Sequence, residues 1–147
     1  MNATAAKALF DDAISKLDER LLASRGWVVH SREFPLLDVS FRSTERQELR
    51  LRLSCGDWND TPPSVDLCSA DGALLQALPS LRQGSRVFHA GPHPGRGRPF
   101  VCTPGVLEYH VHPSHVGDHW TNYKGRESFS LGGIVMQIWR GWEQVWP

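Results

Sequence analysis

Four side chains that can do chemistry fall close together in the segment CTPGVLEYHVH. Cys102 is followed by Glu108, His110 and His112, within eleven residues. A thiolate is a nucleophile, and a carboxylate beside an imidazole fixes the tautomer of the ring and raises its basicity. The pattern therefore predicts either covalent catalysis on Cys102 or a compact metal site.

The last three of these residues stand at alternating positions, so in an extended chain they would share one face. Glu108, His110 and His112 are predicted to support Cys102, either by orienting or deprotonating an acceptor amine or by shaping the loop. As an alternative, Cys-x5-Glu-x-His-x-His predicts a zinc site formed by Cys102, Glu108, His110 and His112. Because a zinc-bound thiolate is a poorer nucleophile, the two hypotheses exclude each other. The first requires no cofactor.

The surroundings of Cys102 favour the nucleophile. Residues 84–105 are rich in glycine and proline, as loops that carry functional groups often are. Arg96 and Arg98 lie close by in sequence, and positive neighbours are expected to lower the pKa of a thiol. The Pro104-Gly105 turn is expected to present backbone N–H groups toward a developing oxyanion.

The other cysteines and histidines have simpler interpretations. The chain has three cysteines and no CxxC, so neither a disulfide framework nor a zinc finger is predicted. Cys55 and Cys68 occupy apolar strand contexts and are expected to be structural. His89 and His93 are expected to stabilise a loop through hydrogen bonds from ring to backbone. Two further histidines, His115 and His119, are spare candidates.

Hydrophobic periodicity predicts the elements that must position these residues. One amphipathic helix is expected over 4–24 and a second over 130–145. Between them, strands are expected at 27–29, 36–41, 48–53 and 64–68. This order predicts an α+β protein with an antiparallel meander, formed as a single domain over residues 1–147.

Composition excludes several classes of partner. The chain of 147 residues has 16 Lys and Arg against 16 Asp and Glu, so no net charge favours nucleic acid or a membrane surface. The first residues lack the basic and apolar regions expected of a signal peptide, and no apolar run reaches the ~20 residues that span a bilayer. A cytoplasmic location is therefore expected.

Several motifs resemble the ubiquitin-conjugating (UBC-like) fold. The turn Trp58–Val65, with its two prolines, looks like that family's aromatic-to-double-proline turn before strand four. His93-Pro94-Gly95 followed by Cys102 looks like its His-Pro-Asn motif, spacer and cysteine, and Trp120 follows where a tryptophan often stands. Gly95 departs from the family's asparagine, which supports the oxyanion or the active-site loop.

A closer resemblance is to a bacterial family with a Cys-Glu-His-His signature, formerly predicted to bind metal. Cys102, Glu108, His110 and His112 match that signature. Such proteins resemble the E2 component of Bil-type ubiquitin-like conjugation operons, which are linked to antiphage defence. In these operons an E1-like enzyme, a ubiquitin-like modifier and a JAB-type peptidase accompany the E2-like protein.

The resemblance implies an E2-like transferase. Cys102 would receive a ubiquitin-like modifier as a thioester from an E1-like activating enzyme and pass it to a target lysine. The N-terminal helix would be the docking face for the E1-like enzyme. Two alternatives remain, namely a zinc-binding accessory module and a catalytically inactive adaptor with the same fold.

Overall fold

Four antiparallel strands form the main sheet of the computed structural model, which describes residues 1–147. They are β1 (Trp27–Ser31), β2 (Leu36–Phe41), β3 (Leu49–Ser54) and β4 (Ser64–Cys68). Each strand pairs with the next along the chain, in the order β1-β2-β3-β4. The predicted meander is confirmed, and the predicted bounds of β2 and β4 agree with the structure.

The two faces of the sheet differ as the alternation in β3 predicts. Leu49, Leu51 and Leu53 are fully buried in the core. Arg50 and Arg52 point to the other face, where both guanidinium groups pair with the carboxylate of Asp38. Period-two alternation therefore separates an apolar face from a charged one.

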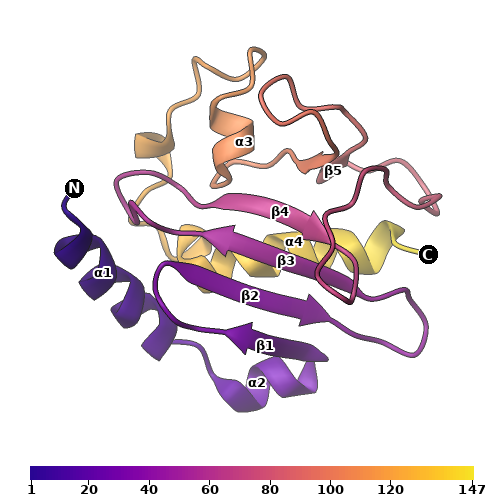
Figure 1. Ribbon diagram of the computed structural model, residues 1–147, viewed down its shortest axis with the longest axis horizontal. Helices are drawn as coiled ribbons and strands as arrows, with labels where there is room; N and C mark the ends of the chain where they lie inside the picture. The colour runs from indigo at the N-terminus through magenta and orange to yellow at the C-terminus, as the bar shows by residue number, and fades with distance from the viewer.

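Helix α4 (Leu131–Val145) covers the apolar face and lies behind the sheet in Figure 1. Its buried stripe includes Ile134, Ile138 and Trp142, as the sequence predicts. Ser130 caps the helix, since its hydroxyl oxygen accepts a hydrogen bond from the N–H of Gly133 at 3.1 Å. The predicted helix over 130–145 is confirmed to within one residue.

The N-terminal prediction is partly wrong. Instead of one helix over 4–24, the chain forms α1 (Ala3–Ser15) and a short α2 (Glu19–Ser24). Asp18 separates them, because its carboxylate accepts hydrogen bonds from the N–H groups of Arg20 and Leu21 and so starts a new helix. The apolar spacing continues across this break, and the local cap decides against a single helix.

The region between β4 and α4 consists of short elements. These are β5 (Phe88–His89), β6 (Phe100–Val101), α3 (Leu107–His110), η1 (Trp120–Asn122) and η2 (Glu127–Phe129). Residues 73–81 form no helix. In Figure 1, α3 and β5 lie beyond the β4 edge of the sheet, on the side away from β1.

One apolar cluster connects the sheet, α1, α4 and the short elements. It includes Phe10 of α1, Phe41 of β2, Val101 of β6 and Trp142 of α4. The structure therefore has the predicted α+β class, with helices at both ends of the chain and a four-stranded antiparallel sheet between them. None of its helices combines the length and the apolar character needed to cross a membrane.

Candidate functional site

Cys102 follows β6 directly, where the chain leaves the small β5–β6 sheet. Its backbone N–H donates to the carbonyl oxygen of Val87 at 2.8 Å. In the turn that follows, the N–H of Val106 donates to the carbonyl oxygen of Thr103 at 3.2 Å, and Gly105 has φ +92°. Proline second and a left-handed glycine third are typical of a type II turn. Local sequence therefore determines how the chain leaves the cysteine.

The N–H of Gly105 is already occupied. It donates to His110 Nε2 at 3.0 Å, so it does not face the thiol as a free oxyanion donor, and that expectation is wrong for Gly105. Because Nε2 accepts, Nδ1 of His110 carries the hydrogen and donates to the carbonyl oxygen of Asp118 at 2.8 Å. His110 thus links the turn to the loop at Asp118 with both ring nitrogens, and burial lowers its pKa.

Glu108 is buried against the edge of the sheet, with 1% of its surface exposed. Its carboxylate accepts hydrogen bonds from the Val65 N–H at 2.6 Å and the Ser64 hydroxyl at 2.9 Å. Arg96 adds an ion pair at 3.3 Å. Burial raises the pKa of Glu108, although these partners favour its charged form. The geometry attaches α3 to β4, which favours the loop-shaping role over that of a base.

The expected extended segment is wrong, because residues 107–110 form α3. The N–H of Leu107 donates to the carbonyl oxygen of Pro63 at 2.9 Å, so the double-proline turn holds the start of this helix. On a helical turn Glu108 and His110 point in different directions. Tertiary anchoring of the helix therefore overrides the alternating pattern.

The structure does not bring together the four side chains of the zinc alternative. No three His, Cys, Asp or Glu side chains are grouped so that they could hold a metal ion. Of the four predicted ligands, Glu108 faces Ser64 and Val65, while His110 bonds to backbone groups with both nitrogens. Cys102, Glu108, His110 and His112 are neighbours in sequence whose ligand atoms do not converge.

His93 has the loop-stabilising role that was predicted. Its Nδ1 accepts a hydrogen bond from the N–H of Gly95 at 3.0 Å, and Nε2 donates to the carbonyl oxygen of Glu108 at 2.8 Å. His89 Nδ1 likewise accepts from the N–H of Gly91. A Cβ at position 95 would lie 3.6 Å from the His93 ring, an ordinary contact. Glycine is therefore not required here by packing.

His112 is less engaged than His110. Its ring stacks on Phe100, with centroids 5.7 Å apart, and its Nδ1 accepts a hydrogen bond from the N–H of Ser114 at 3.1 Å. Its Nε2 forms no hydrogen bond within the chain. Of the two histidines, only His112 has a ring nitrogen that is free to accept a proton.

His115 is the residue that reaches the thiol. Its Nε2 lies 3.6 Å from Cys102 Sγ, within the range of a hydrogen bond to sulfur. The imidazole stacks on the ring of Tyr109, with centroids 4.1 Å apart and planes at 15°. The sequence predicted His115 only as a spare candidate. In the structure, consecutive turns over 112–118 bring it back toward Cys102, and such turns have no recognisable spacing. The only available signal was the density of histidines after the cysteine.

The nearby arginines do not activate the thiol. Arg96 pairs with Glu108, and Arg98 lies 2.6 Å from the carboxylate of Asp66. Burial instead raises the pKa of Cys102, so the expected lowering is wrong. Cys102 is half-buried, whereas Cys55 and Cys68 are fully buried as predicted, and burial raises the pKa of Cys55 to about 12. Only Cys102 is accessible, and it rests as a thiol.

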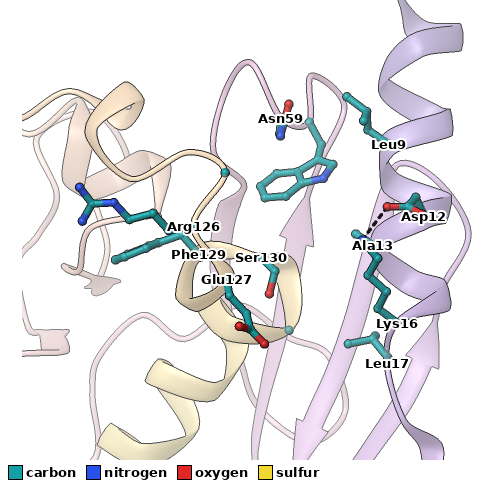
Figure 2. A pocket seen from close by; sticks show the side chains of 13 residues that line it. Leu9, Asp12, Ala13, Lys16, Leu17, Asn59, Arg126, Glu127, Phe129 and Ser130 are labelled. Atoms are coloured by element: carbon teal, nitrogen blue, oxygen red, sulfur yellow. Dashed lines mark ion pairs between the residues drawn. The ribbon is translucent and has the colours of Figure 1, made fainter.

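A separate pocket of about 540 Å³ lies between α1 and the segment that leads into α4. In Figure 2, Leu9, Ala13 and Leu17 line the α1 side, and Phe129 and Ser130 lie on the opposite wall. Charged side chains stand at its edges, among them Asp12, Lys16, Arg126 and Glu127. Cys102 and His115 do not line this pocket, so the molecule has two distinct candidate regions.

The fold and the half-buried Cys102–His115 contact define an α+β protein with one accessible thiol. Residues 90–144 are similar to the Y4jH-like family. The chain is also 42% identical over 41 residues to the uncharacterized protein y4jH of Sinorhizobium fredii (strain NBRC 101917 / NGR234), which is 28% of this chain. This chain covers 20% of that relative. The family match contains Cys102, His115 and most of α4, and excludes the four-stranded sheet.

Proposed function

We propose that the protein is an E2-like transferase of the ubiquitin-conjugating fold, which carries a ubiquitin-like modifier as a thioester on Cys102. An E1-like enzyme supplies the modifier and a lysine of a target protein receives it. The observation that carries the proposal is the accessibility of Cys102 alone among the three thiols. A carrier needs one exposed nucleophile on an otherwise inert surface.

The arrangement of the chain supports the fold assignment. An N-terminal helix, a four-stranded meander, a double-proline turn, a cysteine after a short strand and a C-terminal helix follow in the order of that fold. The Nε1 of Trp120 donates to the carbonyl oxygen of Asn59 at 2.8 Å, so two of the resembling motifs meet in space. Their meeting supports the resemblance beyond the linear order of motifs.

The residues near Cys102 have different roles in this proposal. Cys102 Sγ attacks the thioester carbonyl of the incoming modifier. Glu108 and His110 hold α3 and the turn, whereas His112, with its free Nε2, is placed to take a proton from the acceptor lysine. Val111 and Val116 are exposed beside the histidines, at 52% and 61%, and offer apolar contacts to a protein partner. In an antiphage role the target would belong to the infected cell or the phage.

The surface of α1 is the proposed docking site for the E1-like enzyme. Leu9 is exposed, and two Lys–Asp ion pairs, Lys7–Asp11 and Lys16–Asp12, lie near it on the same helical segment. The pocket in Figure 2 extends this face toward Arg126 and Glu127. Mixed charge around an apolar centre suits a transient protein contact.

The test is adduct formation with an E1-like enzyme, a ubiquitin-like modifier from the same genome and ATP. We expect an adduct that thiol reductant removes and that Cys102→Ala abolishes. Cys55→Ala and Cys68→Ala should retain it, and Cys102→Ser should give an adduct resistant to reductant. An unchanged adduct in Cys102→Ala would exclude this thiol as the carrier.

A catalytically inactive adaptor of the same fold is the second candidate. The raised pKa of Cys102 favours it, since a half-buried thiol without a cationic neighbour is a weak nucleophile at neutral pH. The adaptor would bind the modifier or the E1-like enzyme without forming an adduct. Binding by wild type and Cys102→Ala with equal affinity, and no adduct in either, would favour the adaptor over the transferase.

A further inference from the structure

We propose that Cys102 and His115 form a nucleophile–base pair, and that Tyr109, held by Asp118, positions the imidazole. The proposal rests on the proposed function for its acyl donor but not for the pair itself. Its central observation is the 3.6 Å separation of Cys102 Sγ and His115 Nε2, brought together by the turns that follow α3. No residue of the Cys-Glu-His-His signature other than Cys102 belongs to the pair.

His115 stacks on Tyr109, and a hydrogen bond to Asp118 holds the hydroxyl end of that tyrosine. Its ring lies nearly parallel to that of Tyr109, at 4.1 Å. The Tyr109 hydroxyl donates to Asp118 Oδ2 at 2.6 Å, and the Tyr123 hydroxyl donates to the same oxygen at 2.6 Å. These bonds lower the pKa of Asp118 and raise that of Tyr109. The carboxylate therefore stays charged and the tyrosine stays protonated, so the support keeps its geometry at neutral pH.

The resting thiol needs a base. Burial raises the pKa of Cys102, and neither Arg96 nor Arg98 faces it. With hydrogen on Nδ1, His115 has a lone pair on Nε2 directed at the thiol. Other titratable groups around His115 are His112, whose ring centroid is 5.8 Å away, Tyr109, and His110, which interacts with it electrostatically.

The reaction step balances within the pair. The proton of Cys102 moves to His115 Nε2 as Sγ bonds to the carbonyl carbon of a thioester. The tetrahedral oxyanion then collapses, the carbon–sulfur bond to the donor breaks, and the proton on His115 passes to the leaving thiolate. The modifier is then joined to Cys102, and His115 is again neutral.

Alkylation of Cys102 by iodoacetamide tests the pair without any partner protein. The rate at Cys102 is followed by mass spectrometry from about pH 6 to about pH 10, where thiols titrate. We expect His115→Ala to slow alkylation at neutral pH about tenfold, because the thiol then has no base beside it to accept its proton. The difference should shrink as the pH rises. His119→Ala is the matched control, because that exposed histidine makes no side-chain hydrogen bond, and it should follow wild type.

Variants of Tyr109 separate stacking from simple folding. Tyr109→Phe keeps the stacked ring and should retain most of the rate, whereas Tyr109→Ala should approach His115→Ala, with each fold checked by circular dichroism. Identical pH profiles for wild type and His115→Ala would overturn the pair. A His115-dependent profile without any adduct from an E1-like enzyme would uphold the pair and refute the transferase. Normal loading and normal alkylation in His115→Ala would refute the pair and uphold the transferase.

Discussion

The main sheet with α4 and the segment around Cys102 are held together by different kinds of interaction. The sheet and α4 depend on backbone ladders and on buried apolar side chains such as Leu51, Ile138 and Trp142. The segment 84–119 has two-residue strands and one turn of helix. Side chains hold it, since Glu108 accepts from the N–H of Val65 in β4 and His110 from the N–H of Gly105. Repetitive secondary structure thus builds the scaffold, and individual polar contacts shape the site.

The difference predicts unequal effects of mutation. In the scaffold, stability comes from buried volume, and truncation leaves a cavity. Near Cys102, a single polar side chain satisfies backbone donors or acceptors far away in sequence, so its loss exposes unpaired groups locally.

The largest loss of stability is expected for Trp142→Ala. The indole is 2% exposed, lies against Phe41 and donates from Nε1 to the carbonyl oxygen of Gln47 at 3.1 Å. Its removal should lower the free energy of unfolding by about 3–5 kcal/mol. Denaturant unfolding measures this, with the exposed Arg140→Ala on the same helix as the control. Equal losses in the two variants would contradict the buried-core interpretation of α4.

Glu108→Ala should give the next largest effect. It leaves the buried N–H of Val65 without an acceptor, which costs about 1–3 kcal/mol. The control is Glu143→Ala, an exposed carboxylate on α4. Urea unfolding compares the two, and a loss no larger than that of the control would show that Glu108 does not anchor α3.

Glu108→Gln isolates the charge of the same side chain. Because burial raises the pKa of Glu108 above its ordinary value, its contribution to stability is fully present below that ordinary value. This contribution is lost as the pH rises through the folded-state pKa. Between about pH 4 and about pH 7, wild type should therefore lose more stability than Glu108→Gln. If the free energies of unfolding of wild type and Glu108→Gln changed in parallel over this range, Glu108 would not have a raised pKa in the fold.

A local effect is expected from protonation of His110. Burial lowers its pKa in the fold, so the unfolded chain binds a proton first as the pH falls below the ordinary value of 6.5. The added proton would also displace the Gly105 N–H from Nε2. Protection of the Gly105 amide from hydrogen exchange, relative to the unfolded chain at the same pH, should fall below that pH, while protection in β3 stays unchanged. His110→Phe should show low protection at Gly105 at every pH.

The smallest effect is expected for Arg98→Ala. The pair with Asp66 at 2.6 Å connects the cysteine loop to β4, but both side chains are partly exposed. Its loss should cost about 0.2–1 kcal/mol and less at high salt. Thermal unfolding at low and high salt measures this. A larger effect would place the loop–sheet connection at this ion pair instead of at Glu108.

Much of the scaffold followed from the sequence alone. Alternation predicted β3 and its two faces, and hydrophobic periodicity predicted β2, β4 and α4. These patterns are local and repeat with the period of the element that they form, so they can be recognised without a partner. The type II turn after Cys102 also belongs to this class, because proline and glycine specify it by their own backbone preferences.

The tertiary structure decided the composition of the site. Alternation over 108–112 predicted a shared face, but α3 forms instead, held by the carbonyl oxygen of Pro63 and by the contact of Glu108 with β4. The approach of His115 to Cys102 depends on turns and on a tyrosine stack that carry no periodic signal. The sequence by itself determined the four strands of the main sheet, α4 and the nucleophile candidate. Packing between segments distant in the chain decided which histidine faces it, because such contacts have no fixed spacing for a sequence to display.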